Sequence, residues 1–424
     1  MEPMERIIFH IDVNSAFLSW EAAYRIHHLG GKLDLRTIPS AVGGDIELRH
    51  GIILAKSIPS KKYNIQTGES VMEAKKKYPG LILVPPNYGL YEKCSNAFMN
   101  ILRKYTDTVE QYSIDEAFLD MSGTQKLFGS PVCVANRIKD EIYENLGFTV
   151  NVGIGPNKLL AKMASDFKKP NMVHTLFYDE IQKKMWPLPV RDLFFCGHAT
   201  ERKLHALGIL TIGDIAKTDI RFLCSHLKKQ GEIIWNFANG IDVSPVQTMS
   251  IPNKGYGNST TIPYDVSDAR TAKAVLLSLA ETVGKRLRRD EKRIKLVSIG
   301  IRYYDLSYMS HQGMLVSATN ITIEIWQRAC TLFDEAWDGT PIRHLGIHTA
   351  KVCSTEEGRQ LSLFDSYDYE KQEKLDAAVD EIRTRFGNDA LIRAAFIRQD
   401  KIDHLSGGIS REKRSVDYDR IEVI

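Results

Sequence analysis

Two adjacent carboxylates between two short apolar segments constrain this chain more than any other feature. Residues 108–114 alternate in the manner of a strand, residues 117–119 read as a second strand, and Asp115 and Glu116 lie between them. The pair is therefore expected at or beside a tight hairpin. Neighbouring carboxylates repel each other unless a positive charge lies between them, and oxygen ligands favour magnesium, manganese or calcium. A lone Asp-Glu pair is more often a solvated turn, so a metal site needs a partner elsewhere in the chain.

Asp12 is that partner. It stands at the C-terminal end of a buried strand predicted over residues 7–12, and helical spacing begins directly after it. An acid at a strand end and a paired acid on a later hairpin can converge. Three converging carboxylates can hold two divalent ions about 3.5–4 Å apart, which is the arrangement used for in-line phosphoryl displacement.

The order of the predicted elements supports this convergence. With residues 16–82 set aside, the chain from residue 7 to residue 154 follows the order β-α-β-β-α-β, which is that of a ferredoxin-like fold. In that fold the first strand and the central hairpin are neighbours. Asp12 can therefore reach Asp115 and Glu116 despite their distance in the sequence.

Two segments resemble the catalytic motifs of a known family. Residues 12–17 (Asp-Val-Asn-Ser-Ala-Phe) and residues 113–117 (Ser-Ile-Asp-Glu-Ala) are similar to the two catalytic motifs of the Y-family DNA polymerases, with the bacterial polymerase IV and V group as the nearest likeness. The resemblance extends from about residue 7 to about residue 386. It implies a template-directed DNA polymerase of the lesion-bypass type, acting in DNA repair and damage tolerance on primer-template DNA and deoxynucleoside triphosphates.

The resemblance also implies roles for individual residues. Asp12, Asp115 and Glu116, helped by the Val13 carbonyl, are expected to hold two Mg²⁺ ions, with Mn²⁺ as an alternative. Phe17 matches the aromatic steric gate that packs against the deoxyribose and excludes a 2′-hydroxyl. The other interpretation makes Phe17 only the first core residue of its helix.

Two lysines match the positions that contact the triphosphate in the family. Lys61 stands where the family has an arginine, and Ile58 stands where it has a tyrosine; lysine keeps the charge but loses bidentate geometry. Lys158 follows a glycine turn at a helix start, where backbone N–H groups and the helix dipole favour a phosphate. The alternative for both lysines is a solvated basic surface.

The predicted fold is a multidomain α+β protein. It has a ferredoxin-like palm, small fingers, a helical helix-hairpin-helix thumb and a little-finger domain with a second β-α-β-β-α-β order. The expected divisions are a palm (1–15 and 83–172), fingers (16–82), a thumb (173–246), a linker (247–255), a little finger (256–355), a sliding-clamp peptide (360–365) and a helical then flexible tail (366–424). The thumb hairpin carries Phe195 at the first glycine position of the motif and Gly197 at the second, so a distorted hairpin is expected.

Two further segments predict macromolecular partners. A basic cluster at the end of a predicted helix and the start of the next strand suits a surface that follows DNA phosphates; it comprises Lys285, Arg286, Arg288, Arg289, Arg293, Lys295 and Arg302. The clamp peptide resembles the motif that docks on the bacterial sliding clamp, with anchors at Gln360, Leu361, Leu363 and Phe364. A solvated charged face is the ordinary alternative for the basic cluster.

Composition places the chain in a broad class. It has 424 residues, 43% of them hydrophobic and 26% charged, which is typical of a soluble globular protein with several domains. The net charge of +3 says little about nucleic acid, so the distribution of charge matters more. Six scattered cysteines, no apolar run long enough for a membrane and no signal peptide are expected of a cytoplasmic protein with reduced thiols. The resemblance further implies a monomer that associates with the nucleoid during repair.

Two other functions remain open from the sequence. A nucleotide cyclase uses a similar two-metal palm, but it would have no use for a helix-hairpin-helix or a clamp peptide. A catalytically silent DNA-binding relative would be expected to lack part of the carboxylate set, whereas Asp12, Asp115 and Glu116 are all present. Primer extension separates both of these alternatives from a polymerase.

Overall fold

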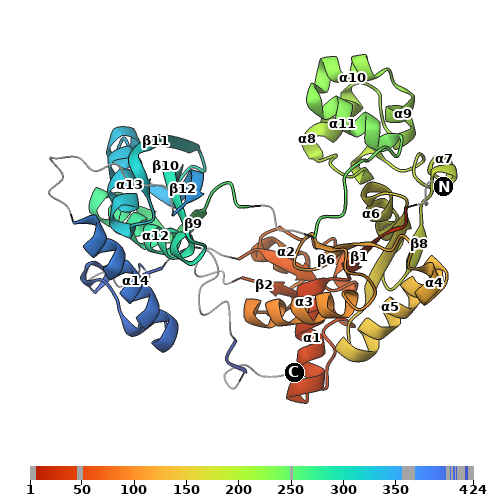
Figure 1. Cartoon of the computed structure of the whole chain (residues 1–424), viewed down its shortest axis with the longest axis horizontal. Coiled ribbons are helices and arrows are strands. Elements are labelled where there is room, and N and C mark those ends of the chain that lie inside the picture. The colour runs from red at the N-terminus through yellow and green to blue at the C-terminus, as the bar shows by residue number, and fades with distance from the viewer. Residues whose placement is uncertain are drawn as a thin grey trace.

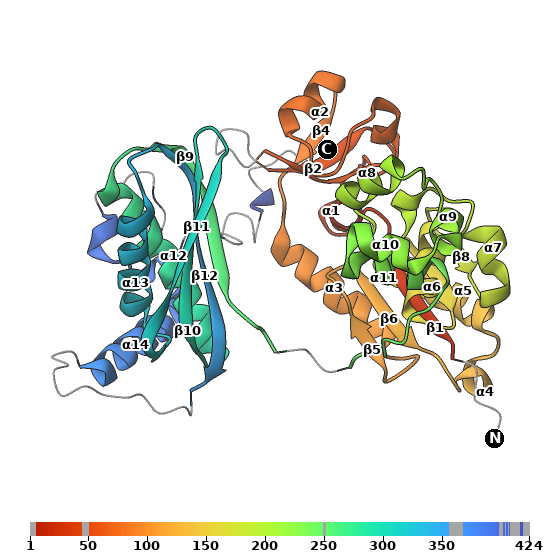
Figure 2. The ribbon, with the colours of Figure 1, turned by 90° about the horizontal axis from the view of Figure 1, so that it is seen from above.

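The computed structural model describes residues 6–44, 51–248, 252–355 and 368–397, together with a few single positions up to residue 418. Figures 1 and 2 show two bodies joined by the segment that follows the thumb helices. The first body carries the palm, fingers and thumb, and the second carries a four-stranded sheet with three long helices. The predicted mixed α+β class is confirmed.

The palm is built on a five-stranded sheet with the order β5-β6-β1-β7-β8. Its strands are β1 (Ile8–Val13), β5 (Val109–Gln111), β6 (Glu116–Asp120), β7 (Val150–Gly155) and β8 (Val173–Thr175). Its helices are α1 (Ala16–Leu29), α3 (Tyr88–Leu102), α4 (Gln125–Phe128), α5 (Pro131–Leu146) and α6 (Lys158–Asp166). The first four strands have the ferredoxin-like arrangement, because β1 lies between β6 and β7 and is antiparallel to both.

The two faces of β1 meet different helices, because successive side chains of a strand alternate. Phe9 and Ile11 belong to the main palm core with residues of α1, α3 and α5. Ile8 lies on the other face and packs against Ala161 of α6. Asp12 shares this second face, so the strand directs the acid toward α6 and the segment that follows it.

A small separate core forms the fingers. The strands are β2 (Ser40–Gly43), β3 (Ile53–Lys56) and β4 (Ile82–Val84), and α2 (Val71–Lys77) packs on them with a 3-10 turn at Pro59–Tyr63. Leu18 and Trp20 of α1, by contrast, are buried in the palm core. The helix α1 lies within the segment 16–82 that was expected to form the fingers, but it packs on the palm core, and the small fingers core is formed by residues after it.

Short helices form the thumb. In the described part of the chain, none of the helices is both long enough and apolar enough to cross a membrane. The thumb elements are α7 (Ile181–Lys184), a 3-10 turn at Val190–Asp192, α8 (His198–Ala206), α9 (Ile212–Lys217), α10 (Ile220–Leu227) and α11 (Lys229–Ala238). Their buried residues form one cluster with Leu159 and Leu160 of α6. The thumb therefore packs against the same helix that faces Asp12.

The second body has the predicted β-α-β-β-α-β element order but a different sheet. Its elements are β9 (Gly257–Val266), α12 (Ala269–Arg289), β10 (Lys292–Tyr303), β11 (Tyr308–Thr319), α13 (Thr322–Ala336), β12 (Ile342–Ser354) and α14 (Tyr369–Phe386). The strand order is β11-β10-β12-β9. Here the last strand lies between the first and second, whereas in the palm the first strand takes the inner place.

Candidate active site

Three acids from two strands meet at one end of the palm sheet. Asp12 and Glu116 stand opposite each other in the antiparallel register of β1 and β6. The amide of Val13 donates to the carbonyl oxygen of Asp115 at 3.0 Å, which ties the hairpin to the strand end. The convergence expected from the element order is therefore present in the backbone.

A cavity of about 270 Å³ opens beside these acids. It is lined by residues of β1, α1 and the fingers, namely Asp12, Val13, Ser15, Ala16, Phe17, Leu54, Ala55, Lys56, Lys61, Thr67 and Asp115. Two carboxylates contribute to it, and two lysines stand with them in the same lining. An opening with both signs of charge suits a polyanion that arrives with cations.

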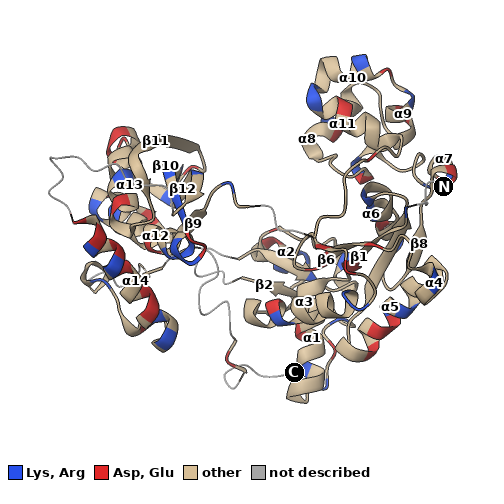
Figure 3. Cartoon of the chain, viewed as in Figure 1, with Lys and Arg blue, Asp and Glu red and all other residues tan. Residues whose placement is uncertain are grey.

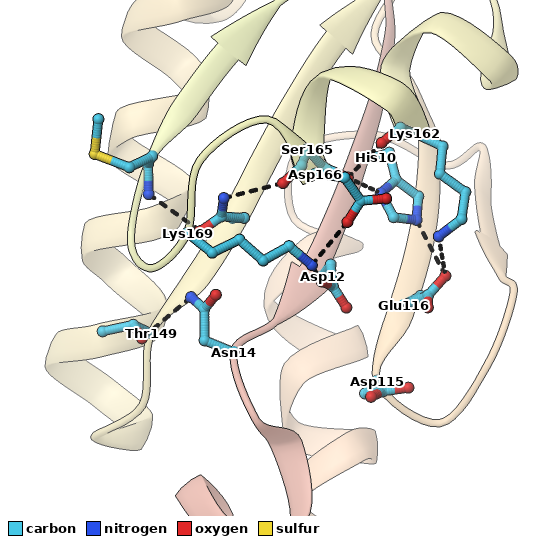
Figure 4. Close-up of polar contacts among 12 residues, drawn as sticks. His10, Asp12, Asn14, Asp115, Glu116, Thr149, Lys162, Ser165, Asp166 and Lys169 are labelled. Carbon is cyan, nitrogen blue, oxygen red and sulfur yellow. Dashed lines mark hydrogen bonds and ion pairs between the residues drawn. The ribbon is translucent and has the colours of Figure 1, made fainter. Parts of the chain in front are cut away.

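Asp12 is buried and forms an ion pair with Lys169, which follows α6 (Figure 4). Burial raises the pKa of Asp12 to about 6, although the Lys169 ammonium opposes that shift. Lys169 also contacts Asp166 at 2.9 Å. Above pH 6 the Asp12 carboxyl is mainly ionised and is able to bind a cation.

Glu116 is held by two donors on the same oxygen. His10 Nε2 lies 3.3 Å from Glu116 Oε2, and Lys162 Nζ lies 2.9 Å from it. Burial alone would raise the pKa of Glu116, but the hydrogen bonds from His10 and Lys162 outweigh it and lower the pKa to about 2. Glu116 is therefore a carboxylate at any physiological pH.

Asp115 is less buried than Asp12, and its side chain bonds within its own turn. The hydroxyl of Ser113 donates to its Oδ1 at 2.6 Å, and the Asp115 amide donates to the Ser113 hydroxyl at 3.2 Å. This local turn fixes the side chain at the tip of the hairpin. Figure 4 shows Asp115 set apart from the lysine contacts made by Asp12 and Glu116.

The donor set fits a hard divalent cation in kind, because it consists of carboxylate oxygens and the Val13 carbonyl. Within the described ranges no group of three or more His, Cys, Asp or Glu side chains is gathered tightly enough to hold an ion. Two of the acids instead form ion pairs, Asp12 with Lys169 and Glu116 with Lys162. A cation bound here would compete with these ammonium groups for the same carboxylates.

Comparison with known proteins agrees with this geometry. The model of the impB/mucB/samB family matches residues 11–166, that of its C-terminal domain matches residues 253–363, and that of the family's HHH motif matches residues 178–209. DNA polymerase IV of Clostridium acetobutylicum is 42% identical over 94% of this chain and 100% of the relative. The chain belongs to the impB/mucB/samB family of Y-family DNA polymerases.

Further relatives share nearly the whole length with this family member. DNA polymerase IV of Acetivibrio thermocellus is 40% identical over 94% of this chain and 99% of the relative. DNA polymerase IV 2 of Bacillus subtilis is 37% identical over 92% of this chain and 94% of the relative. A solved Y-family DNA polymerase chimera matches the fold with a TM-score of 0.71 at 23% identity, over 82% of this chain and 99% of that one. The resemblance stated from the two motifs is confirmed.

Phe17 lines the cavity of this Y-family member, as the gate interpretation requires. Its ring stacks on Tyr91 with the ring centroids 4.4 Å apart and the planes 6° from parallel. Trp20 and Tyr88 contact it from two other sides. The ring is therefore held rigidly by the palm core while it borders the cavity.

Lys158, which was expected to contact the triphosphate, lies in an ion pair with Glu110. Lys158 Nζ lies 2.7 Å from both carboxylate oxygens of Glu110, and the residue is not in the cavity lining. The N-terminus of α6 is also already occupied, because the Leu159 amide donates to the carboxylate of Asp242 at 3.1 Å. No phosphate is needed to explain this charge or this helix start.

The glycines before α6 have a packing role. A Cβ on Gly153 would lie 1.9 Å from the carbonyl oxygen of Ala161, and one on Gly155 would lie 2.8 Å from the Ala161 amide. Only glycine lets α6 approach β7 so closely. The turn therefore lets α6 lie close to the sheet, with Lys162 at Glu116 and Lys169 at Asp12.

Sequence reasoning missed three lysines of this site. Lys162 and Lys169 contact the carboxylates directly. Lys56 lines the cavity beside Lys61. The pKa of Lys56 is lowered, mainly by burial and also by the neighbouring charge of Lys61. Alternation along β1 predicts which face of the strand carries Asp12. It does not predict which helix covers that face.

The thumb hairpin has a left-handed backbone conformation at Phe195, the position where the motif usually has a glycine. This residue has a φ of +67°, in the left-handed region, and its carbonyl oxygen accepts a hydrogen bond from Gln230 at 2.9 Å. Its ring packs on Phe194 and Phe237. Gly197 is the N-cap of α8 with a φ of −83°, which other residues can adopt. The turn required by the motif is thus made by a phenylalanine whose contacts offset its backbone strain.

Two arginines of the predicted DNA-binding cluster form ion pairs within the second body. Arg288 makes ion pairs with Asp376 and Asp380 of α14, and Arg293 makes one with Glu373 of the same helix. Figure 3 shows acidic residues along α14 where it lies by α12. These two arginines therefore link α12 and β10 to α14 through ion pairs.

The other members of the cluster have separate placements. Lys285 donates to Asn388, Arg286 donates to the carbonyl of Gly257, and Arg289 pairs with its neighbour Asp290 while most of its side chain is exposed. Lys295 and Arg302 both lie on β10. Ile301 points into the core, so alternation places the next side chain, Arg302, on the sheet face away from the helices. Lys295 is half-buried. Arg302 is exposed.

The clamp peptide with Gln360, Leu361, Leu363 and Phe364 lies outside the described residues. The described chain ends before it at residue 355, directly after β12, and resumes at residue 368, directly before α14. The prediction for this peptide stays a prediction.

Proposed function

We propose that this Y-family member is a template-directed DNA polymerase of the lesion-bypass type, which adds deoxynucleotides to a primer 3′ end by two-metal phosphoryl transfer. The observation that carries the proposal is the single cavity that contains Asp12, Asp115, Phe17 and Lys61. Acids for cations, a ring for the sugar and a lysine for the triphosphate are the three requirements of this reaction. They come from different parts of the chain and meet in one place.

In this mechanism Asp12, Asp115, Glu116 and the Val13 carbonyl hold two Mg²⁺ ions, with Mn²⁺ as an alternative. When bound, the ions would lower the pKa of the primer 3′-hydroxyl and neutralise the charge that develops on the triphosphate. Lys61 and Lys56 add positive charge from the fingers side of the cavity. The stacked ring of Phe17 orients the sugar.

We propose that Lys169 changes its ion-pair partner when Asp12 binds a cation. In the free protein its ammonium balances the buried carboxylate of Asp12. When Asp12 binds a cation instead, Lys169 becomes available for a phosphate oxygen of the nucleotide. The buried site thus keeps a balanced charge both with and without substrate.

Primer extension tests the proposal. The purified full-length chain with Mg²⁺, primer-template DNA and four deoxynucleoside triphosphates is expected to lengthen the primer, also past defined template lesions. Formation of a cyclic nucleotide without primer extension would favour the cyclase. DNA binding without either product would favour the silent relative.

The phosphate-contacting surface gives a prediction about salt. Arg302→Gln should flatten the slope of log K for DNA against log salt by about one unit, because one phosphate contact is lost. Arg288→Gln should leave the slope unchanged and destabilise the protein by about 1–3 kcal/mol, because buried Asp376 loses one of its two arginine partners and keeps only Arg393. The measurements are DNA affinity at several salt concentrations and chemical denaturation. An unchanged slope for Arg302→Gln would remove that residue from the DNA surface.

Residues 360–365 give a prediction about a partner. Replacing Leu363 and Phe364 by Ala should abolish binding to the bacterial sliding clamp, because a few anchor side chains carry most of the binding energy of an extended peptide. Primer extension without the clamp should stay as in the wild type. The measurement is pull-down of purified clamp, with Tyr367→Ala as the control just outside the motif. Equal clamp retention by wild type and variant would contradict the assignment.

The proposed cellular location follows from the substrate. A polymerase of this type acts on chromosomal DNA, which places it in the cytoplasm at the nucleoid during repair. Fluorescence microscopy of the tagged chain before and after DNA damage checks this location.

A further inference from the structure

His10 lies two residues before Asp12 on β1 and therefore on the same face of the strand. Its side chain is fully buried between the sheet and α6. A buried imidazole is tolerated only when its nitrogens have hydrogen-bond partners. Both have one, since Nδ1 lies 2.7 Å from the Ser165 hydroxyl and Nε2 lies 3.3 Å from Glu116 Oε2 (Figure 4).

The direction of these bonds follows from the chemistry of the partners. An ionised carboxylate only accepts, so His10 Nε2 carries the hydrogen and donates it to Glu116. In a neutral ring Nδ1 then accepts, and the Ser165 hydroxyl donates to it. If the Ser165 hydroxyl instead donates to the Lys162 carbonyl, 2.8 Å away, Nδ1 also carries a hydrogen. In both arrangements the Nε2–H group points at Glu116.

Both donors to Glu116 use the same oxygen. His10 and Lys162 contact Oε2, and within the described part of the chain Oε1 has no hydrogen-bond partner. Lysine is a flexible donor with four rotatable side-chain bonds, so Lys162 alone would not fix the carboxylate. The His10 ring is held by strand, helix and Ser165, so it can fix the orientation of the Glu116 carboxylate.

We infer that His10 is a positioning residue for Glu116, with Ser165 fixing the ring, so that Oε1 is presented to a divalent cation. The inference rests on the proposed two-metal function and adds to it a residue that touches neither metal nor substrate. Asp115 has an equivalent holder in the Ser113 hydroxyl, at 2.6 Å. Glu116 would thus be oriented by the His10 ring, and Asp115 by the neighbouring Ser113 hydroxyl, before any cation binds.

The test compares donors of different kind at residue 10. His10→Phe keeps a ring but removes both nitrogens, whereas His10→Gln keeps an N–H group that reaches Glu116. Binding of Mn²⁺ to the complex of polymerase and primer-template DNA is followed by electron paramagnetic resonance, which needs no turnover. We expect His10→Phe to weaken Mn²⁺ binding about 10- to 100-fold, the usual effect of losing a residue that orients a ligand, and to raise the Mg²⁺ concentration for half-maximal extension in parallel.

Three further variants keep the inference falsifiable if His10→Phe unfolds. His10→Gln should bind Mn²⁺ within about threefold of the wild type, because the N–H donor is retained. Ser165→Ala should weaken Mn²⁺ binding less than His10→Phe does. Ser40→Ala is the matched control, since it removes a fully buried hydroxyl that bonds the Leu35 carbonyl outside the site, and it should leave Mn²⁺ binding unchanged.

Two outcomes overturn the inference while the proposed function stands. One is a folded His10→Phe or Ser165→Ala variant with wild-type Mn²⁺ affinity. The other is a His10→Gln variant that loses as much affinity as His10→Phe, since the ring volume and not the hydrogen bond would then matter. Failure of the wild type to extend primers would instead overturn the proposed function and this inference with it.

Discussion

Asp115→Ala should lower the rate of nucleotide addition by about three or more decades, because the developing charge of the transition state loses the cation that this acid would hold. The fold should survive the change. Asp115 is only half-buried, and its side chain bonds just the Ser113 hydroxyl and not a distant element. The measurement is single-turnover primer extension, with the melting temperature taken for the same preparation.

A matched control lies at the other end of the same strand. Asp120 of β6 is also half-buried and stands 4.0 Å from Arg6, away from the cavity. Asp120→Ala should extend primers at nearly the wild-type rate. Near-normal extension by Asp115→Ala, or equal losses in the two variants, would contradict the assignment of Asp115 as a metal ligand.

Phe17→Ala should let ribonucleotides into the site. With the stacked ring removed, the space next to the sugar can accept a 2′-hydroxyl, and the preference for deoxyribonucleotides should fall by about 10²-fold, since shape alone gives discrimination of this size. The measurement is the ratio of incorporation efficiencies for one deoxyribonucleotide and its ribonucleotide on one template. The residue borders the cavity, so the loss of stability should be smaller than for a fully buried ring.

Phe98 provides the control for a loss of core packing. It lies on α3 and is fully buried in the same palm core. Phe98→Ala should cost about 3–5 kcal/mol of stability and leave the sugar preference as it is. If Phe17→Ala behaved in the same way, Phe17 would be a core residue and not a gate.

Local signals in the sequence were sufficient to predict most of the helices and strands near the site. Serine is a typical residue at a helix start, and the Ser70 hydroxyl accepts a hydrogen bond from the Glu73 amide at the N-cap of α2. Glycine is typical after a helix end, and Gly147 adopts a φ of +72° after α5. Caps and alternation involve residues within a few positions of each other, so their energies are already present in a short stretch of chain.

The acids of the site were predictable for a related reason. Asp12 stands at the end of a buried strand, and Asp115 with Glu116 lies on a hairpin, so the acids meet when the elements adopt the ferredoxin-like strand order. The second body has the same element order but a different strand order, with β12 between β9 and β10. Element order by itself therefore does not determine which strands are neighbours.

The sequence by itself determined the carboxylates, the helix ends and the domain classes, because each follows from local pattern and chain order. Only the tertiary structure decided the partners of the charged side chains. Lys158 bonds Glu110 while Lys169 reaches Asp12, and Arg288 is neutralised by acids of α14. A basic residue looks the same in sequence whether it meets a phosphate or an internal acid. The outcome depends on which acid the packing of distant helices brings within about 4 Å, where an ion pair gains enough to offset the loss of water.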